Sequence, residues 1–159
     1  MEFVIIRPPL VYGPNAPGNL GFLLRVLKQG IPLPLGAIHN KRCFVALDNL
    51  VDLIVTCLDH SAADNQIFLV GDKDVLSTTE FLRCLGQALE KPAHLLPVPQ
   101  KLLKFGLKVL GKEDIGLKLC SSMQIDISKA KDLLDWEPVV TVEEALKKIA
   151  NAYLEEKIT

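Results

Sequence analysis

The stretch Val4-Ile5-Ile6-Arg7-Pro8-Pro9-Leu10-Val11-Tyr12-Gly13-Pro14 decides the fold. Residues 3–6 form a continuous apolar run of β-prone residues, which is typical of a strand buried on both faces in a parallel sheet. A central parallel strand needs neighbours on both sides, and no strand precedes this one. We therefore expect an N-terminal part of the fold to be missing and the strand to have unpaired edges. The prolines and glycine that follow predict an ordered loop.

The composition indicates one globular domain. The chain has 159 residues, of which 49% are hydrophobic and 23% charged, and this suits a single packed core. A net charge of -1, with both signs mixed along the chain, argues against a nucleic-acid-binding module. No apolar run reaches the ~18 residues of a membrane span, and the first residues do not form a signal peptide. We expect a cytoplasmic protein.

The cysteines and histidines do not suggest a metal site. The four cysteines stand at positions 43, 57, 84 and 120, without Cys-x-x-Cys spacing and without a nearby histidine in a ligand pattern. The sequence therefore predicts reduced, mostly buried thiols.

Patterns of helix type dominate the rest of the chain. Asn19 can cap a helix that runs to about residue 29 and ends at Gly30, and Asp48 can cap one that runs to about residue 59. Capping boxes begin at Ser77 and Thr141. Further helices are expected at about 99–110 and 128–134, a strand at 66–70, and two extended segments joined by a polar turn at 31–36 and 42–47.

Five segments, in this order, resemble extended short-chain dehydrogenases of the NAD-dependent epimerase/dehydratase family. They are residues 4–14, 19–20, 33–36, 42–52 and 126–138. The resemblance covers essentially the whole chain. It implies an α/β fold that is the C-terminal part of an extended Rossmann-type enzyme, helix-rich with short strands and without the N-terminal glycine-motif half. Residues 1–159 would then form one substrate-binding domain, in which residues 1–12 resemble a remaining strand and loop of the cofactor domain.

The resemblance also implies roles for individual residues in binding a nucleotide-sugar. Asn19 and Leu20 match positions at the substrate diphosphate, where a helix start favours an anion. Leu33 and Leu35 match positions that flank the base, commonly uracil. Arg42 matches an arginine that pairs with the diphosphate, because a guanidinium can grip two phosphate oxygens. From the residues alone, Asn19 fits a plain helix cap as well, and Arg42 alone fits a surface arginine.

Other matched positions lie toward the sugar and the cofactor. Met123 would sit beside the hexose, where a non-aromatic side chain leaves room for an N-acetyl group. Pro8 and Pro9 lie where the family's loop passes the nicotinamide and the sugar. Leu10 departs from the asparagine that many 4-epimerases carry there, and Tyr12 fits either core packing or the site.

The family's chemistry needs two motifs that these residues do not supply. One is a Gly-x-x-Gly-x-x-Gly turn that receives the pyrophosphate. The other is a catalytic Tyr-x-x-x-Lys pair on a helix. Tyr153 and Lys157 have this spacing, but a solvated helix face explains them better. NAD is thus the cofactor of the parent family and is not expected to bind well to this chain alone, which we expect to be inactive.

The expected function is to bind the UDP-hexose or UDP-N-acetylhexosamine of an NAD-dependent sugar 4-epimerase. The alternatives are a 4-ketoreductase of UDP-deoxy-amino sugars and a non-catalytic UDP-sugar-binding fragment. The expected partner is a UDP-sugar, with no nucleic acid and no membrane span. Exposed strand edges, or the apolar segment 102–110, leave self-association open.

Overall fold

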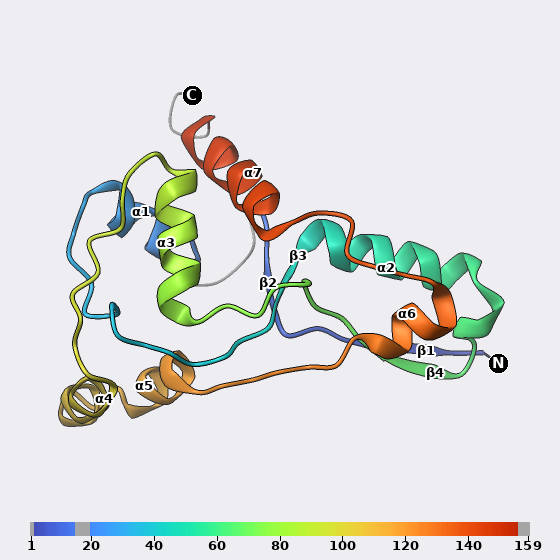
Figure 1. Cartoon of the computed structure of the whole chain (residues 1–159), viewed down its shortest axis with the longest axis horizontal. Coiled ribbons are helices and arrows are strands. Elements are labelled where there is room, and N and C mark those ends of the chain that lie inside the picture. Colours follow the sequence, from blue (N-terminus) through green and yellow to red (C-terminus); the bar gives the residue numbers. More distant parts are fainter. Residues whose placement is uncertain (1, 15–19, 156–159) are drawn as a thin grey trace.

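The computed structural model, which describes residues 2–14 and 20–155, contains two pairs of short parallel strands (Figure 1). Strand β1 (Val4–Arg7) pairs with β4 (Gln66–Leu69), so that Ile5 lies opposite Ile67. Strand β2 (Leu10–Tyr12) pairs with β3 (Phe44–Ala46). The strand expected near residues 66–70 is confirmed, and it supplies a neighbour for β1.

The prediction that the first strand is buried on both faces is wrong for this chain. Phe3 is 49% exposed, and Ile5 and Ile67 are each 40% exposed. Val4 and Ile6 point to the other face of the strand pair, where they pack under α2 and α6. Side chains alternate across a strand, so one covered face buries every second residue and leaves the rest open.

The helices follow the expected order. Within the described ranges they are α1 (Leu20–Lys28), α2 (Leu47–Asp59), α3 (Thr78–Ala88), α4 (Gln100–Val109), α5 (Glu113–Cys120), α6 (Ser128–Leu134) and α7 (Val142–Glu155), with a 3₁₀ turn at Ser61–Ala63. Gly30 ends α1 with a φ of 68°, as the pattern predicted. The capping box at Ser77 is confirmed, and Thr141 makes the corresponding bonds with Glu144. Helix α5 was not predicted.

One local prediction is wrong. Asp48 does not cap α2, whose N-cap is Ala46 without a side-chain bond; Asp48 instead accepts a hydrogen bond of 2.6 Å from Lys148. The extended segments expected at 31–36 and 42–47 each pair with a third segment. Leu33 forms a parallel bridge with Leu95, whereas residues 44–46 form β3 beside β2. Hydrogen bonds to segments distant in the sequence therefore outweigh pairing across the short turn that joins the two segments.

Two hydrophobic clusters share the β2–β3 pair as a wall. The first cluster contains Tyr12, Phe44 and Ala46 together with apolar residues of α1, α3 and α7. The second contains Val45 together with residues of α2, β4, α6 and the buried Trp136. The period of two along β3 sends alternate side chains into the two clusters. Trp136 packs in the second cluster, and its Nε1 donates to the Asp52 carboxylate of α2 at 2.8 Å.

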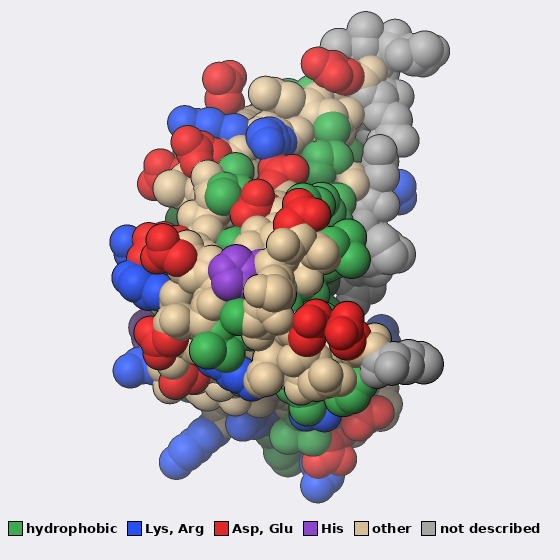
Figure 2. All heavy atoms as spheres, turned by 90° about the vertical axis from the view of Figure 1, so that its right-hand side faces the viewer, with side chains coloured by type: hydrophobic (Ala, Val, Ile, Leu, Met, Phe, Trp, Pro, Cys, Tyr) green, Lys and Arg blue, Asp and Glu red, His purple; other side chains and the backbone are tan. Residues whose placement is uncertain are grey.

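The two ends of the molecule differ in their elements. Helices α4 and α5 lie at the lower left of Figure 1, and β1, β4, α2 and α6 lie at the right. Figure 2 looks onto the right-hand end, where hydrophobic side chains reach the surface in separate groups among charged ones. None of the described helices is both long and apolar enough to cross a membrane.

Candidate functional site

The backbone of Arg42 is held between two other segments. Its amide donates to the Leu76 carbonyl at 3.0 Å, and the Leu76 amide donates back at 3.1 Å. On the other side, the Cys43 amide donates to the Met123 carbonyl at 2.9 Å, and the Met123 amide donates to Lys41 at 2.8 Å. The fold thus brings together Arg42 and Met123, two residues that the sequence placed at the same site.

The side chain of Arg42 is hydrogen-bonded through one nitrogen and has further N–H donors. Nη1 donates to the Lys118 carbonyl of α5 at 2.7 Å, and the guanidinium carbon lies 5.7 Å from the centroid of the Phe44 ring. Among the described residues, no group accepts a hydrogen bond from the buried Nε. Burial lowers the pKa of the guanidinium from its usual range. An anion beside the guanidinium would offset the cost of its burial.

The start of α3 positions the loop that leads to Arg42. Asn40, which is buried, accepts a hydrogen bond from the Thr78 amide at 2.9 Å and donates to the carbonyls of Leu119 and Ser121 at 3.1 and 2.8 Å. Thr78 donates to the same Leu119 carbonyl at 2.9 Å. The end of α5, the start of α3 and the Arg42 loop are therefore one hydrogen-bonded unit. Sequence analysis did not identify Asn40.

Among the described residues expected near the base and the start of α1, Leu35 is hydrogen-bonded to this unit, whereas Leu20 and Leu33 contact other segments. Asn19 lies outside the described residues. Leu20 opens α1 and packs, half-buried, against the first cluster. Leu33 pairs with the segment at 94–96. Leu35 is buried, and its carbonyl accepts from the Thr79 hydroxyl at 2.6 Å. Their roles in binding a base or a diphosphate stay predictions.

The remaining predicted positions lie at the edges of the site. Met123 is 40% exposed beside Arg42. Pro8 is exposed and Pro9 half-buried, and both lie in the short link between β1 and β2. This link joins the two strand pairs. Contacts of Pro8 and Pro9 with a cofactor stay a prediction.

A buried polar network around Asp72 ties the strands to the C-terminal segment. Tyr12 donates to Asp72 at 2.5 Å, and Asp72 also accepts from the Ala46 amide at 2.9 Å and the Asn49 side chain at 2.7 Å. Asn49 in turn accepts from the amides of Val139 and Val140. Burial raises the pKa of Tyr12 above its usual range, and the Asp72 carboxylate raises it further. The hydroxyl therefore stays protonated and donates, and Tyr12 belongs to the core.

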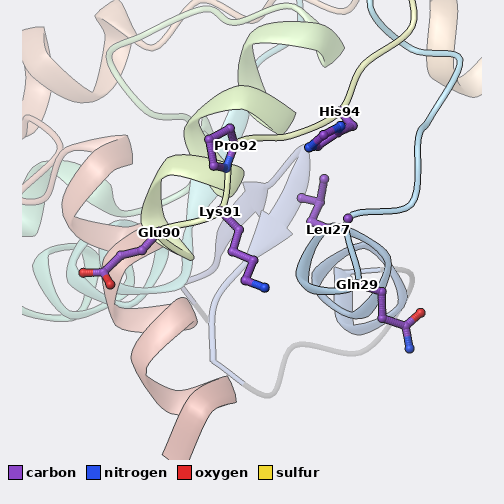
Figure 3. Close-up of a pocket in the computed structure, with 7 residues that line it drawn as sticks. Leu27, Gln29, Glu90, Lys91, Pro92 and His94 are labelled. Atoms are coloured by element: carbon purple, nitrogen blue, oxygen red, sulfur yellow. The ribbon is translucent and has the colours of Figure 1, made fainter.

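A pocket of about 340 Å³ lies elsewhere, between the ends of α1 and α3 (Figure 3). Its lining contains none of the predicted site residues: Leu27, Gln29, Gly30, Glu90, Lys91, Pro92 and His94. Figure 3 shows Glu90 and Gln29 directed outward on opposite sides. Polar groups do not converge in this pocket, so we place the candidate site at Arg42. In residues 2–14 and 20–155, no three His, Cys, Asp or Glu side chains form a cluster that could hold a metal ion.

Comparison with known proteins gives close similarity over part of longer chains. No protein-family model matches the chain. The UDP-glucose 4-epimerase of Vibrio cholerae is 49% identical over 156 residues, which are 98% of this chain and 48% of that protein. The chain spans about half the length of these curated relatives.

Solved structures share the fold at lower identity. The UDP-glucuronic acid 4-epimerase of Bacillus cereus in complex with NAD gives a TM-score of 0.70 at 22% identity, covering 96% of this chain and 43% of that one. The UDP-N-acetylglucosamine 4-epimerase of the same organism gives 0.68 at 22% identity, covering 93% of this chain and 45% of that one. These matches confirm the predicted fold class, a helix-rich part of a Rossmann-type epimerase with short parallel strands.

Proposed function

From the premise that this chain corresponds to the C-terminal part of a member of the NAD-dependent epimerase/dehydratase family, we propose that it binds the nucleotide-sugar substrate of a sugar 4-epimerase. The relatives and structural neighbours include UDP-sugar 4-epimerases, so the proposed ligand is a UDP-hexose or UDP-N-acetylhexosamine. The observation that carries the proposal is the guanidinium of Arg42, which is held by the Lys118 carbonyl and the Phe44 ring beside the exposed Met123.

In this proposal Arg42 binds the diphosphate. A planar guanidinium can donate to two phosphate oxygens at once, and the Lys118 carbonyl holds the plane in place through Nη1. Met123, which is bridged to Arg42, is proposed to face the hexose, and Pro8 and Pro9 are proposed to face the cofactor. When bound, NAD supplies a hydride acceptor for C4 of the sugar. Binding energy from the nucleotide end would hold the hexose in position for that chemistry.

We propose that the 159 residues bind substrate but do not turn it over. They contain no Gly-x-x-Gly-x-x-Gly turn, and Tyr153, the tyrosine with a lysine four residues later, packs half-buried against the first cluster. Incubation with NAD and a UDP-sugar should therefore give no epimer.

A 4-ketoreductase acting on UDP-deoxy-amino sugars is the second candidate. The observation that favours it is Met123, which is 40% exposed beside Arg42 and leaves space for an N-acetyl group where an aromatic ring would not. Calorimetric titration with UDP-N-acetylglucosamine and with UDP-glucose separates the two sugar classes. Tighter binding of the acetylated sugar, lost in Met123→Phe, would support the acetylated class.

The central test is calorimetric titration of the chain with UDP. We expect saturable binding that weakens about tenfold or more in Arg42→Ala, since a charge-assisted hydrogen bond contributes about 1.5–3 kcal/mol. Arg42→Lys should also bind more weakly, because an ammonium cannot grip two oxygens in a plane. Arg83→Ala, an exposed arginine of α3, is the matched control and should bind as the unaltered chain does. Equal affinity of Arg42→Ala for UDP would refute the proposed role.

A further inference from the structure

The outer surface of α4 carries two parallel stripes of different character. One stripe is apolar and strongly exposed: Leu102 is 60% exposed, Phe105 65% and Val109 71%. The other stripe is basic, and its lysines are exposed at positions 101, 104 and 108. Helix α4 contains no acidic residue. We call these two stripes together the α4 surface.

Helical geometry sets the two stripes side by side. At about 100° per residue, the three apolar side chains fall within about 60° of one another, and so do the three lysines. The centres of the stripes differ by about 100° around the axis on the same estimate. An apolar strip bordered by lysines is typical of a helix that lies in a membrane interface, because the lysine stems reach up to the headgroups.

The rotation of α4 about its axis is fixed by its inner face. Leu103 is 9% exposed and belongs to the first cluster, against which Leu107 also packs. On α5, a Cβ added at Gly116 would lie 3.2 Å from Leu107 Cδ1, so the two helices approach closely there. The apolar stripe therefore cannot turn inward without losing this packing.

We propose that the α4 surface docks on an anionic lipid bilayer, with the apolar stripe at the boundary between headgroups and acyl chains and the lysines on lipid phosphates. The charge of the surface selects this occupant. Lys108 pairs with Glu113 of α5 at 3.7 Å, so Lys101 and Lys104 are the cations left to meet a partner. A second copy would bring these lysines against each other, and α4 itself has no carboxylate to pair with them. A nucleic acid would leave the apolar stripe without a partner.

The place of α4 in the fold fits such a contact. In Figure 1, α4 and α5 lie at the end of the molecule opposite β1, the segment that resembles the cofactor side of the family. The described helices include none that could span a bilayer, so the contact would be peripheral. Helix α5 also holds Arg42 through the Lys118 carbonyl. The proposed contact and the candidate sugar site are therefore neighbours, although neither depends on the other.

The test is co-sedimentation of the 159-residue chain with vesicles of phosphatidylcholine alone or mixed 3:1 with phosphatidylglycerol, a ratio of about one anionic lipid in four. We expect binding to the anionic vesicles that is about tenfold stronger than to neutral ones and that weakens as salt screens the lysines. The double variant Phe105→Ser/Val109→Ser should bind the anionic vesicles about tenfold more weakly. Lys101→Gln and Lys104→Gln should each lower this binding about fivefold, the equivalent of one lysine near an anionic surface. Leu58→Ser, which removes a side chain 79% exposed on α2, is the control and should bind normally.

Three outcomes would overturn the proposal. The first is an absence of binding to anionic vesicles. The second is binding that needs the lysines but survives Phe105→Ser/Val109→Ser, which would indicate a diffuse attraction between charges. The third is a dimer in analytical ultracentrifugation that Phe105→Ser abolishes, without vesicle binding, which would make the partner a second copy. Val109→Trp tests how deeply α4 enters the bilayer. Brominated lipids should quench the fluorescence of this tryptophan and leave that of the buried Trp136 unchanged.

Discussion

At the scale of single residues, the Tyr12–Asp72 pair should contribute measurably to stability. Tyr12→Phe removes one of three donors to the buried carboxylate while keeping the ring in contact with Phe81, 5.5 Å away between centroids. We expect a loss of about 1–3 kcal/mol in the free energy of unfolding, because the carboxylate keeps its burial but loses a bond. Urea unfolding measures this loss. A change within error would mean that water replaces the hydroxyl.

The same residue should give the chain a dependence on alkaline pH. The pKa of Tyr12 is raised in the folded state, so the unfolded chain releases this proton first. The contribution of protonated Tyr12 to the free energy of unfolding is complete below its pKa of about 10 in the unfolded chain, and it is lost as the pH rises above that value. Stability should decline above about pH 10, and it should decline less steeply in Tyr12→Phe. An equal decline of stability with pH in the unaltered chain and in Tyr12→Phe would contradict this account.

The residues of the candidate site were predictable in part. The family resemblance pointed to Arg42 and Met123, and the fold places them beside each other. It could not point to Asn40, Asn49 or Asp72, since their partners lie 23 to 91 residues away and a single sequence does not show such distant hydrogen bonds. The Gly71-Asp72 pair that ends the strand expected at 66–70 was the available signal.

At the scale of elements, the start of α3 should matter more than the start of α7. Ser77 is 7% exposed, accepts from the Glu80 amide at 3.1 Å and donates through its own amide to the Glu80 carboxylate at 2.7 Å. Ser77→Ala should cost about 1 kcal/mol or more. Thr141→Ala, in the exposed box of α7, is the matched control and should cost less. Thermal unfolding compares the two, and a larger loss in Thr141→Ala would contradict the argument.

Local signals explain which elements could be predicted. Both capping boxes and the glycine that ends α1 act within a few residues, so the sequence shows them directly. Helix α5 escaped notice because it has eight residues and carries Gly116 near its middle. The pairing of β3 with β2 was missed because it joins segments more than thirty residues apart, and this choice depends on both clusters.

At the scale of the whole molecule, the shared β2–β3 wall should make the two clusters unfold together. Phe44 and Ala46 lie in the first cluster and Val45 in the second, so neither can lose its packing without moving the same strand. Leu146→Ala removes a fully buried side chain of the first cluster and should cost about 2–5 kcal/mol. Trp136 lies in the second cluster and reports on it through its fluorescence.

If the wall couples the clusters, Leu146→Ala will shift the urea midpoint of Trp136 fluorescence by as much as it shifts the midpoint of helical circular dichroism. Leu53→Ala, at a fully buried position of the second cluster, is the reciprocal variant and should also move both midpoints together. A fluorescence midpoint that stays in place while the dichroism midpoint falls would show that each cluster unfolds alone. The three residues of β3 would then join two separately stable units, and substitutions beneath α7 would leave the β1–β4 end intact.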